Sequence, residues 1–324
     1  MGKDVGGMRL ISLADLHAAR AALSGRLHRT PTFTCATLGT RTDTDLYIKA
    51  ELFQKTGSFK PRGALNKLIS LTDQERSRGV ITISAGNHAQ GVAFAARELG
   101  IRATVVMPEA AVRSKVEATR SYGAEVILHG TGKDLLPKAQ ELQAERDLTF
   151  VHPFDDPYVI AGQGTVGLEL MEDVPDADVV VVPVGGGGLI AGVASAVKLL
   201  RPDTWVVGVE PEGAPGMTLS LRDNEPAHLD STNTIADGLA APFVGALNLA
   251  HVQAYVDDVV LLTDDEIILG LRLLMERAKL QVEPSGAAAF AALLTGKVSA
   301  PSGARVACIA SGGNVDHARL KDLL

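Results

Sequence analysis

Short apolar runs alternate with helical patterns along most of the chain, and this alternation constrains the fold more than any other feature. The run GVITIS (79–84) predicts a buried strand, HAQGVAFAARELG (88–100) predicts a helix that ends at Gly100, and ATVVMP (103–108) predicts the next strand. Further strands are predicted at 125–128, 149–152, 178–184, 205–210 and 305–310, and further helices at 113–122, 134–146 and 189–200. Strands that are apolar on both faces and separated by helices indicate mostly parallel, twisted sheets covered by helices. The sequence therefore predicts an α/β protein.

Two capping boxes and one polar segment complete the outline. Thr72 with Glu75, and Thr263 with Glu266, place a hydroxyl and a carboxylate where both can bond free N–H groups at a helix start. The polar, turn-rich segment 211–234 predicts a long surface excursion and not a linker between independent domains.

Length and charge exclude several classes of partner. A chain of 324 residues is long enough for two lobes, and its net charge of -7 offers no basic field, so neither nucleic acid nor a membrane is an expected partner. Cys35 and Cys308 are far apart and match no disulfide framework or zinc spacing, which suits two buried thiols in a reducing compartment. The N-terminus lacks a continuous apolar run, so we expect a cytoplasmic protein.

Ligands of open parallel sheets bind beyond the carboxyl ends of the strands, and three loops there are unusual. They are SAGNHAQG after strand 79–84, GGGG after strand 178–184, and SGGNVD after strand 305–310. Four consecutive glycines that end at a helix start expose a row of backbone N–H groups beside the positive end of the helix dipole. This loop predicts a phosphate site.

The identity of the phosphate compound stays open on this motif alone. Gly186, Gly188 and Ala191 fit GxGxxA, and Glu210 ends the next strand about twenty residues later, as in a nicotinamide dinucleotide site. A nicotinamide-dependent oxidoreductase is therefore the alternative from another functional class. This hypothesis assigns no role to Lys60 or to the loops SAGNHAQG and SGGNVD.

Lys60 lies between Phe59 and Pro61, in a setting that favours partial desolvation of its amine. Desolvation lowers the pKa of an amine toward the neutral, nucleophilic form, which can form a Schiff base with an aldehyde cofactor. The alternative is a solvated lysine whose stem lies on Phe59. A Schiff-base lysine together with a phosphate cradle is what pyridoxal phosphate requires.

Together these segments resemble the fold-type II pyridoxal-phosphate enzymes, in particular the threonine/serine dehydratase and serine racemase group. The resemblance covers nearly the whole chain. Its motifs are RTPTF (29–33), KTGSFKPRGA (55–64), SAGNHAQGVA (84–93), HPFDD (152–156), IAGQGT (160–165), PVGGGGLIAG (183–192), IADGLA (235–240), EPSGAAAFAALL (283–294) and SGGNVD (311–316). The resemblance implies a two-lobed fold similar to tryptophan synthase β. A large cofactor domain would comprise residues 1–78 and 150–324, and a small, mobile substrate-loop domain residues 79–149.

The resemblance also implies roles for individual residues. Lys60 would hold pyridoxal 5'-phosphate as a Schiff base, and Phe59 would pack beside its ring. Asn87 would bond the phenolic oxygen, and Ser311 would face the pyridine nitrogen. The phosphate would be held by Gly185, Gly186, Gly187 and Gly188. The substrate carboxylate would be received by the loop Ser84, Ala85, Gly86, Asn87 and His88, although His88 fits a hydrogen-bonding role at the helix start equally well.

The implied reaction is β-elimination from a 3-hydroxy amino acid, which converts L-threonine to 2-oxobutanoate and L-serine to pyruvate, each with ammonia. Serine racemase and 3-hydroxyaspartate dehydratase are alternatives within the family, and a catalytically silent metabolite-binding protein is a third possibility. In the racemases a serine precedes the Gly-Asn-His of the substrate loop, and here that residue is Ala85. Without a second proton donor racemisation is disfavoured.

The racemases also imply a divalent-cation site and oligomers. Glu210 and Ala214 fit the cation site, but Gly216 stands where a carboxylate would be, so we expect a weak site, with a monovalent ion as the alternative occupant. The resemblance suggests a homodimer or homotetramer.

Overall fold

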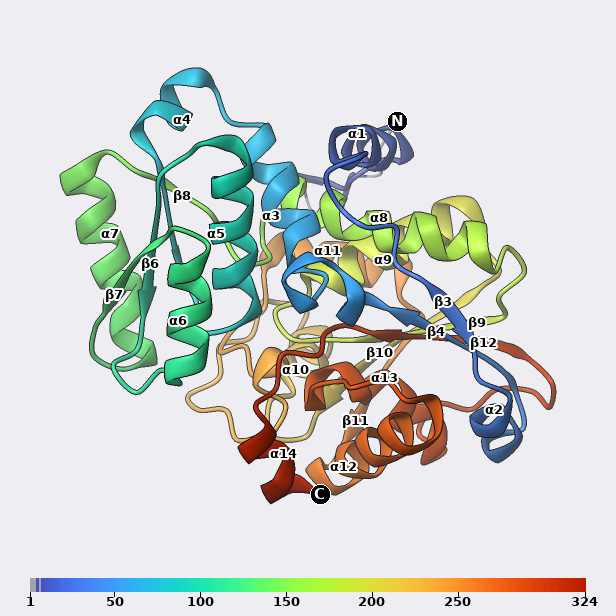
Figure 1. Ribbon diagram of the computed structural model, residues 1–324. Helices are drawn as coiled ribbons and strands as arrows, with labels where there is room; N and C mark the ends of the chain where they lie inside the picture. Colours follow the sequence, from blue (N-terminus) through green and yellow to red (C-terminus); the bar gives the residue numbers. More distant parts are fainter. Residues whose placement is uncertain (1–3, 6) are drawn as a thin grey trace.

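Two β-sheets organise the chain in the computed structural model, which describes residues 4–5 and 7–324 (Figure 1). The larger sheet has the strand order β11-β10-β9-β12-β4-β3, with β3 antiparallel and the other pairs parallel. Its strands are β3 (Thr32–Thr34), β4 (Asp45–Ala50), β9 (Val179–Pro183), β10 (Trp205–Pro211), β11 (Asp258–Leu262) and β12 (Arg305–Ala310). The smaller sheet is parallel, with the order β7-β6-β5-β8. Its strands are β5 (Val80–Ile83), β6 (Ala103–Met107), β7 (Glu125–Leu128) and β8 (Thr149–Phe150). This confirms the predicted α/β class.

Helices cover both sheets on two faces. They are α1 (Leu13–Leu23), α2 (Ala36–Thr42), α3 (Lys60–Ile69), α4 (Asp73–Arg78), α5 (Asn87–Leu99), α6 (Arg113–Ser121), α7 (Leu135–Arg146), α8 (Pro157–Asp173), α9 (Gly188–Leu200), α10 (Gly216–Asp223), α11 (Ala246–Tyr255), α12 (Asp264–Leu273), α13 (Pro284–Leu294) and α14 (His317–Leu323). Short helical turns are η1 (Glu51–Phe53), η2 (Lys55–Gly57), η3 (Gly132–Asp134), η4 (Asp237–Leu239) and η5 (Leu274–Ala278), and β1 (Asp4–Val5) pairs with β2 (Met8–Arg9). None of the described helices is both long enough and apolar enough to cross a membrane.

Alternating residues of the central strands explain why both faces of the larger sheet are covered. In β9, Val179 and Val181 pack in the core that includes α12 and α13, whereas Val180 and Val182 pack in the core that includes α8, α9 and α11. Successive strand side chains point to opposite faces, so a strand buried on both faces is apolar throughout. The uninterrupted valine run thus places β9 in the interior of the sheet.

The smaller sheet completes its core with a helix that precedes it in the chain. Leu65 and Leu68 of α3 are buried together with Val92 of α5 and Val105 of β6, while Leu142 of α7 lies in the core on the other face. The strands of this sheet fall inside the predicted small domain 79–149, apart from the end of β8. The domain division itself stays a prediction, and α3 lies outside its boundary although it shares this core.

Most predicted elements lie within two residues of their observed bounds, and both predicted capping boxes form. The surface excursion 211–234 was an incomplete prediction, because it contains helix α10, in which Met217 and Ser220 are buried. Glu210 at the end of β10 accepts hydrogen bonds from the backbone N–H groups of Met217 and Thr218 at 2.7 and 2.8 Å. A carboxylate from the preceding strand therefore supports this helix start.

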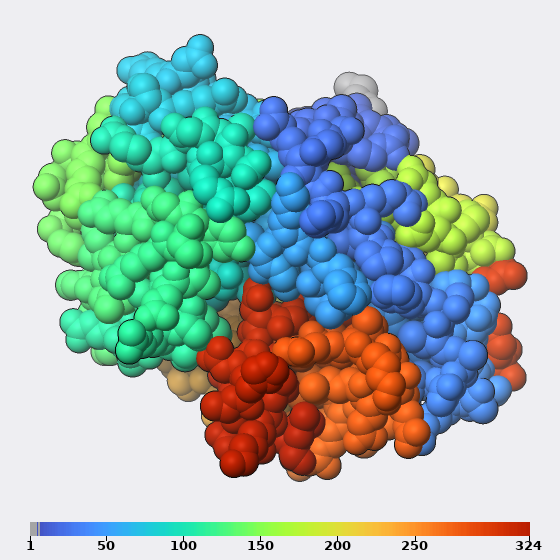
Figure 2. Space-filling view, in the orientation of Figure 1, coloured from blue at the N-terminus to red at the C-terminus, as the bar shows by residue number. Residues whose placement is uncertain are grey.

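The two sheet regions meet along a hollow. Figure 2 shows the surface of residues 80–150 in green and teal on one side, with the red surface of α14 beside it. Two polar contacts join the regions there: Ser114 Oγ lies 3.0 Å from Asp316 Oδ2, and Lys115 Nζ lies 3.2 Å from Asp237 Oδ2. The cavity described next lies beneath these contacts.

Candidate active site

The four-glycine loop forms one wall of a cavity of about 420 Å³ between the two sheets. A Cβ atom added to Gly186 would lie 2.4 Å from the ring of Phe154, and one added to Gly188 would lie 2.8 Å from Phe154 Cβ. Gly187 has φ of 98°, in the left-handed region that favours glycine. Within the described chain, the backbone N–H groups of Gly185, Gly186 and Gly187 have no protein acceptor. The loop thus offers N–H groups to an anion at the start of α9.

Lys60 is the first residue of α3, and its side chain enters the same cavity. Its Nζ donates to the carbonyl of Pro153 at 3.1 Å and lies 5.3 Å from the centre of the Phe59 ring. Burial lowers the pKa of the amine to about 8, and the negative charge of Glu283 acts in the opposite direction. Lys60 is half-buried, and this direction of the pKa shift agrees with the partial desolvation predicted for its amine.

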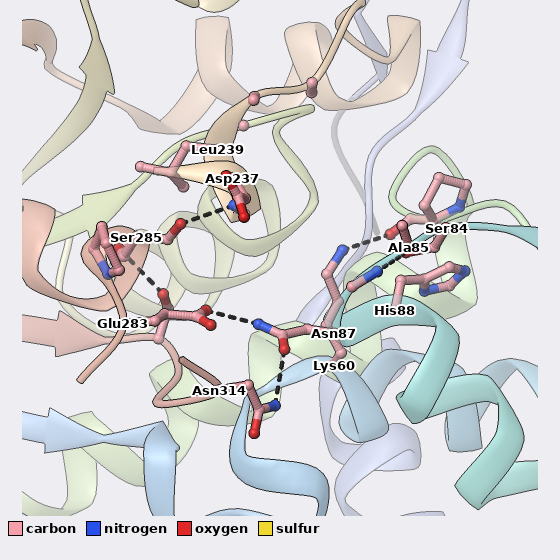
Figure 3. A pocket seen from close by; sticks show the side chains of 18 of the residues that line it. Lys60, Ser84, Ala85, Asn87, His88, Asp237, Leu239, Glu283, Ser285 and Asn314 are labelled. Atoms are coloured by element: carbon pink, nitrogen blue, oxygen red, sulfur yellow. Dashed lines mark hydrogen bonds between the residues drawn. The ribbon is translucent and has the colours of Figure 1, made fainter. Parts of the chain in front are cut away.

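A chain of hydrogen bonds links the start of α5 to the larger sheet. Asn87 Nδ2 donates to Glu283 Oε1 at 2.7 Å, and Asn87 Oδ1 accepts from Asn314 Nδ2 at 2.8 Å (Figure 3). The side chain of Glu283 is buried, and burial raises its pKa to about 7. These two contacts orient the Asn87 amide, and within the described chain its Nδ2 makes no further hydrogen bond.

Ser311, directly after β12, lines the opposite wall. It is buried, and its Oγ lies 3.4 Å from the carbonyl oxygen of Ser285. The backbone N–H of Phe59 donates to the Ser311 carbonyl at 3.1 Å, which ties the segment before Lys60 to the end of β12. Because β9, β12 and β4 are neighbours, their carboxyl ends bring the glycine loop, Ser311 and the Lys60 segment to one edge of the sheet.

The predicted substrate loop follows β5 and faces Lys60 across the cavity. Ser84, Ala85, Gly86, Asn87 and His88 all line it. Ser84 Oγ accepts a hydrogen bond from the Gly86 N–H at 3.1 Å, and His88 Nε2 pairs with Thr82 Oγ1 at 3.0 Å. Burial lowers the pKa of His88 well below its usual value, with the charge of Lys60 acting in the same direction. The His88 side chain thus bonds to the preceding strand and not to the start of α5, and both roles predicted for it stay predictions.

Charged side chains surround the mouth of the cavity. Asp237 of η4 pairs with Lys115 of α6 at 3.2 Å and with Arg319 of α14 at 2.7 Å. Ser285 Oγ accepts from the N–H of Gly238 at 2.9 Å and supports the same turn. The opening is therefore framed by both sheet regions.

The structure does not bring Glu210 to this cavity. Both its carboxylate oxygens bond α10, and burial raises its pKa to about 7. Glu210 is therefore not placed to bind a ribose beside Gly186 and Gly188, and the nicotinamide hypothesis loses its acidic residue. Ala214 lies in the turn before α10, and among the described residues no group of three or more His, Cys, Asp or Glu converges as a metal site. A weak cation site at Glu210 and Ala214 stays a prediction.

Sequence reasoning missed Glu283, Asn314 and the Pro153 carbonyl as site components. EPSGAAAF, SGGNVD and HPFDD were quoted as motifs, but only the fold shows which of their atoms meet Lys60 and Asn87. The signal that could have marked Glu283 is its place directly before the apolar run PSGAAAFAALL, because an ionisable residue beside such a run is unusual.

The chain is similar to known proteins over most of its length. A family model described as pyridoxal-phosphate dependent enzyme matches residues 23–312. The L-threonine ammonia-lyase of Thermotoga maritima is 47% identical over 308 residues, which cover 95% of this chain and 76% of that protein. The catabolic L-threonine dehydratase TdcB of Escherichia coli is 44% identical over 315 residues, covering 97% of this chain and 96% of that one. The structure of maize serine racemase matches with a TM-score of 0.92 at 40% identity and covers 96% of each chain.

Proposed function

Because the chain belongs to the family of pyridoxal-phosphate-dependent enzymes, we propose that it is an ammonia-lyase that converts L-threonine to 2-oxobutanoate and ammonia, and L-serine to pyruvate and ammonia. The observation that carries the proposal is the convergence of Lys60, the glycine loop, Ser311 and Asn87 on one cavity. The 43–47% identical relatives named as threonine ammonia-lyases or dehydratases support the substrate class.

The cavity fits pyridoxal phosphate. Free N–H groups of Gly185, Gly186 and Gly187 suit its phosphate, and a Cβ atom at Gly186 or Gly187 would clash with a neighbouring side chain. Lys60 supplies an amine of lowered pKa for its aldehyde. Ser311 supplies a hydroxyl, not a carboxylate, for the ring nitrogen. When bound, the cofactor acidifies the Cα proton of an attached amino acid.

The residues of this chain then have definite tasks. Lys60, as a neutral amine, takes the Cα proton, and its pKa of about 8 suits a general base near physiological pH. The Pro153 carbonyl accepts a hydrogen bond from Nζ and orients the amine. The backbone of the Ser84–His88 loop and the free N–H of Asn87 receive the substrate carboxylate. The β-hydroxyl leaves as water with the proton that Lys60 took from Cα, and hydrolysis of the released enamine then gives the 2-oxo acid and ammonia.

Racemisation is the competing activity, and Ala85 weighs against it. A lysine on one face of a planar carbanion returns the proton to the side from which it came. Ala85 lines the cavity but has no hydroxyl to deliver a proton to the other face. We therefore propose elimination with little D-amino acid formed.

The test is a substrate scan with two lysine variants. The purified protein is incubated separately with L-threonine, L-serine and 3-hydroxyaspartate, and the released 2-oxo acid and ammonia are measured. The two products should appear in equal amounts. Lys60→Ala should abolish turnover and the visible absorbance of the covalently held cofactor. Lys55→Ala, five residues earlier and outside the cavity, is the matched control and should keep both. Undiminished activity in Lys60→Ala would remove the central claim.

Three finer features are part of the proposal. The protein would act in the cytoplasm, form a homodimer or homotetramer, and move residues 79–149 relative to the larger sheet during turnover. Light scattering measures the oligomeric state, and hydrogen exchange with and without L-serine measures the motion.

A further inference from the structure

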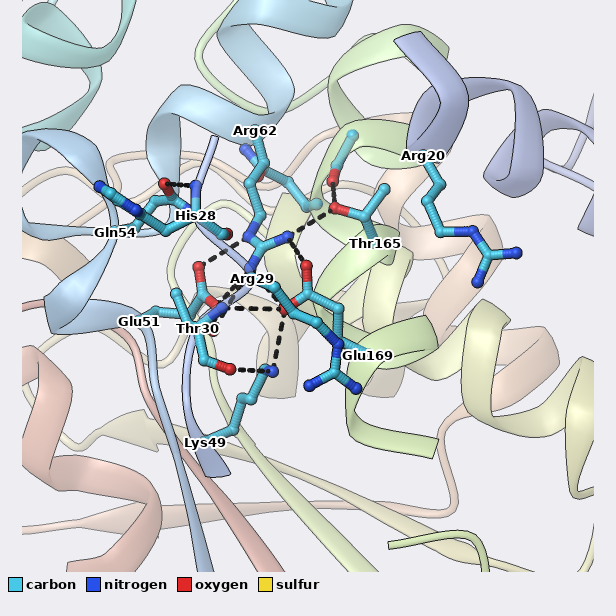
Figure 4. Close-up of polar contacts among 12 residues, drawn as sticks. Arg20, His28, Arg29, Thr30, Lys49, Glu51, Gln54, Arg62, Thr165 and Glu169 are labelled. Atoms are coloured by element: carbon cyan, nitrogen blue, oxygen red, sulfur yellow. Dashed lines mark hydrogen bonds and ion pairs between the residues drawn. The ribbon is translucent and has the colours of Figure 1, made fainter. Parts of the chain in front are cut away.

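A buried ionic cluster lies beside the cavity and takes no part in the proposed chemistry. Its centre is Arg62, two residues after Lys60, whose side chain is only 2% exposed. Arg62 Nε and Nη2 both donate to the carboxylate of Glu51 at 2.8 Å (Figure 4). Nη1 and Nη2 donate to the carboxylate of Glu169 at 2.6 and 2.9 Å. Two carboxylates thus bind two edges of one guanidinium. Thr165 Oγ1 accepts a further hydrogen bond from Arg62 Nη1 at 3.1 Å.

Further bonds extend the cluster into the larger sheet. Lys49 of β4 is fully buried, and its Nζ contacts Glu169 Oε2 at 2.9 Å and the carbonyl of Thr30 at 2.8 Å. Thr30 Oγ1 donates to Glu51 Oε1 at 2.5 Å. Arg62 is the member that comes from α3; the others come from β4, η1, α8 and the segment before β3. The cluster therefore joins the first turn of α3 to the framework of the larger sheet.

The backbone of that first turn is also confined by close packing. A Cβ atom added to Gly91 of α5 would lie 3.1 Å from Lys60 Cβ, and one added to Gly162 of α8 would lie 2.4 Å from the Arg62 carbonyl oxygen. Gly63 N donates to Gln163 Oε1 at 3.1 Å. Glycines of two helices thus approach the turn closely, and the Gln163 side chain of α8 bonds to its backbone.

Stability alone does not account for such a cluster. Replacing a buried ion pair by apolar residues of similar volume is often neutral or stabilising, because desolvation offsets much of the attraction. Paired guanidinium forks instead fix geometry, since both partners must lie in the guanidinium plane. Leu65 and Leu68 of α3 pack in the core of the smaller sheet, whereas the bonds of Arg62 to Glu51 and Glu169 join the start of the same helix to the region of the larger sheet.

We propose that Arg62 is a positioning residue for Lys60: its paired forks to Glu51 and Glu169 hold the start of α3 on the larger sheet, so that the Lys60 amine keeps its place opposite the glycine loop. This inference rests on the proposed function, because it takes Lys60 as the reacting amine. Two motifs to which no role has been assigned, RTPTF and IAGQGT, contribute Thr30 and Thr165 to this cluster.

Arg62→Lys in the holoenzyme is the test, because it keeps the charge and removes both forks. The kcat of the cofactor-saturated variant should fall about 100-fold, the effect expected when a reacting group is displaced by about 1 Å, while KM changes by less than about threefold. The pH at which the visible band of the lysine-bound cofactor changes should shift, and the cofactor should be released faster during dialysis. A purely structural role would lower only the melting temperature.

Two further variants complete the design. Lys67 lies on α3, two turns after Lys60, and its Nζ pairs with Asp156 at 2.7 Å. Lys67→Met removes this ion pair and should leave kcat within about twofold. Glu169→Gln keeps the side-chain volume and one hydrogen-bond acceptor. It replaces Arg62→Lys as the test variant if Arg62→Lys does not fold, and its kcat should fall about tenfold.

Folded Arg62→Lys or Glu169→Gln protein with wild-type kcat, cofactor release and absorbance would overturn the positioning role. That result would leave the proposed function intact. Failure of the proposed function has a different signature, namely wild-type protein that retains the cofactor but releases no 2-oxo acid from any 3-hydroxy amino acid.

Discussion

Replacing the buried Glu283 by glutamine should change how the stability of the cofactor-free protein depends on pH. Burial raises the pKa of Glu283 from 4.5 to about 7. Between these two values the folded protein binds the proton more tightly than the unfolded chain, so the free energy of unfolding falls as the pH rises through this window. A shift of this size corresponds to about 3 kcal/mol, because one pKa unit is about 1.4 kcal/mol. Glutamine cannot ionise, so the free energy of unfolding of the variant does not fall for this reason as the pH rises.

The measurement is the difference in Tm between Glu283→Gln and the wild type from pH 5 to pH 8. With an unfolding entropy of about 2 cal/mol/K per residue, a chain of this length shifts by about 1.5 °C per kcal/mol. The difference should therefore rise by about 4 °C in favour of the variant. Glu212→Gln, at an exposed position, is the matched control and should give a constant difference. A flat profile for Glu283→Gln would refute the assignment of a buried, titrating carboxyl beside Lys60.

Three other outcomes are expected. Ala85→Ser should introduce detectable D-serine formation, seen by chiral chromatography, whereas D-serine appearing as fast as pyruvate in the unmodified protein would contradict the choice of elimination. Gly187→Ala places a Cβ 2.8 Å from Asn248 Cβ at a φ of 98°, so it should cost about 1–3 kcal/mol of stability and weaken cofactor binding at least tenfold in an absorbance titration. Activity should depend weakly on magnesium or calcium and rise with potassium, because Gly216 supplies no carboxylate beside Glu210 and Ala214; complete inactivation by a chelator, restored by magnesium alone, would show a strong divalent site.

The sequence predicted the parts of the fold that are encoded locally. The apolar runs and Gly100 placed β5, α5 and β6 closely, because burial on both faces and a left-handed helix end leave direct marks in composition. Helix α10 was not predicted, because its start depends on Glu210 from the preceding strand and its own sequence is rich in turn residues. Local signals carry no information on such a contact.

Most of the cavity was predictable from loops that follow strands, whereas the polar links between them were not. Lys60 and the glycine loop are recognisable by residue type and setting. The bond from Asn87 to Glu283 joins residues 196 positions apart, and the bond from Arg62 to Glu169 joins residues 107 positions apart. Which distant side chains meet is set by strand order and helix packing, and neither follows from one sequence.

The strand order of the larger sheet has a consequence for the order of events during synthesis. Strand β12 lies between β9 and β4, so the pair β3–β4 cannot join β9, β10 and β11 before residue 310 has left the ribosome. The smaller sheet and α3 need nothing beyond residue 151 to close their shared core. We therefore expect this region to become compact early in synthesis. The edges of β4 and β9 stay unpaired until β12 is synthesised, and chaperones would protect them from pairing with other strands.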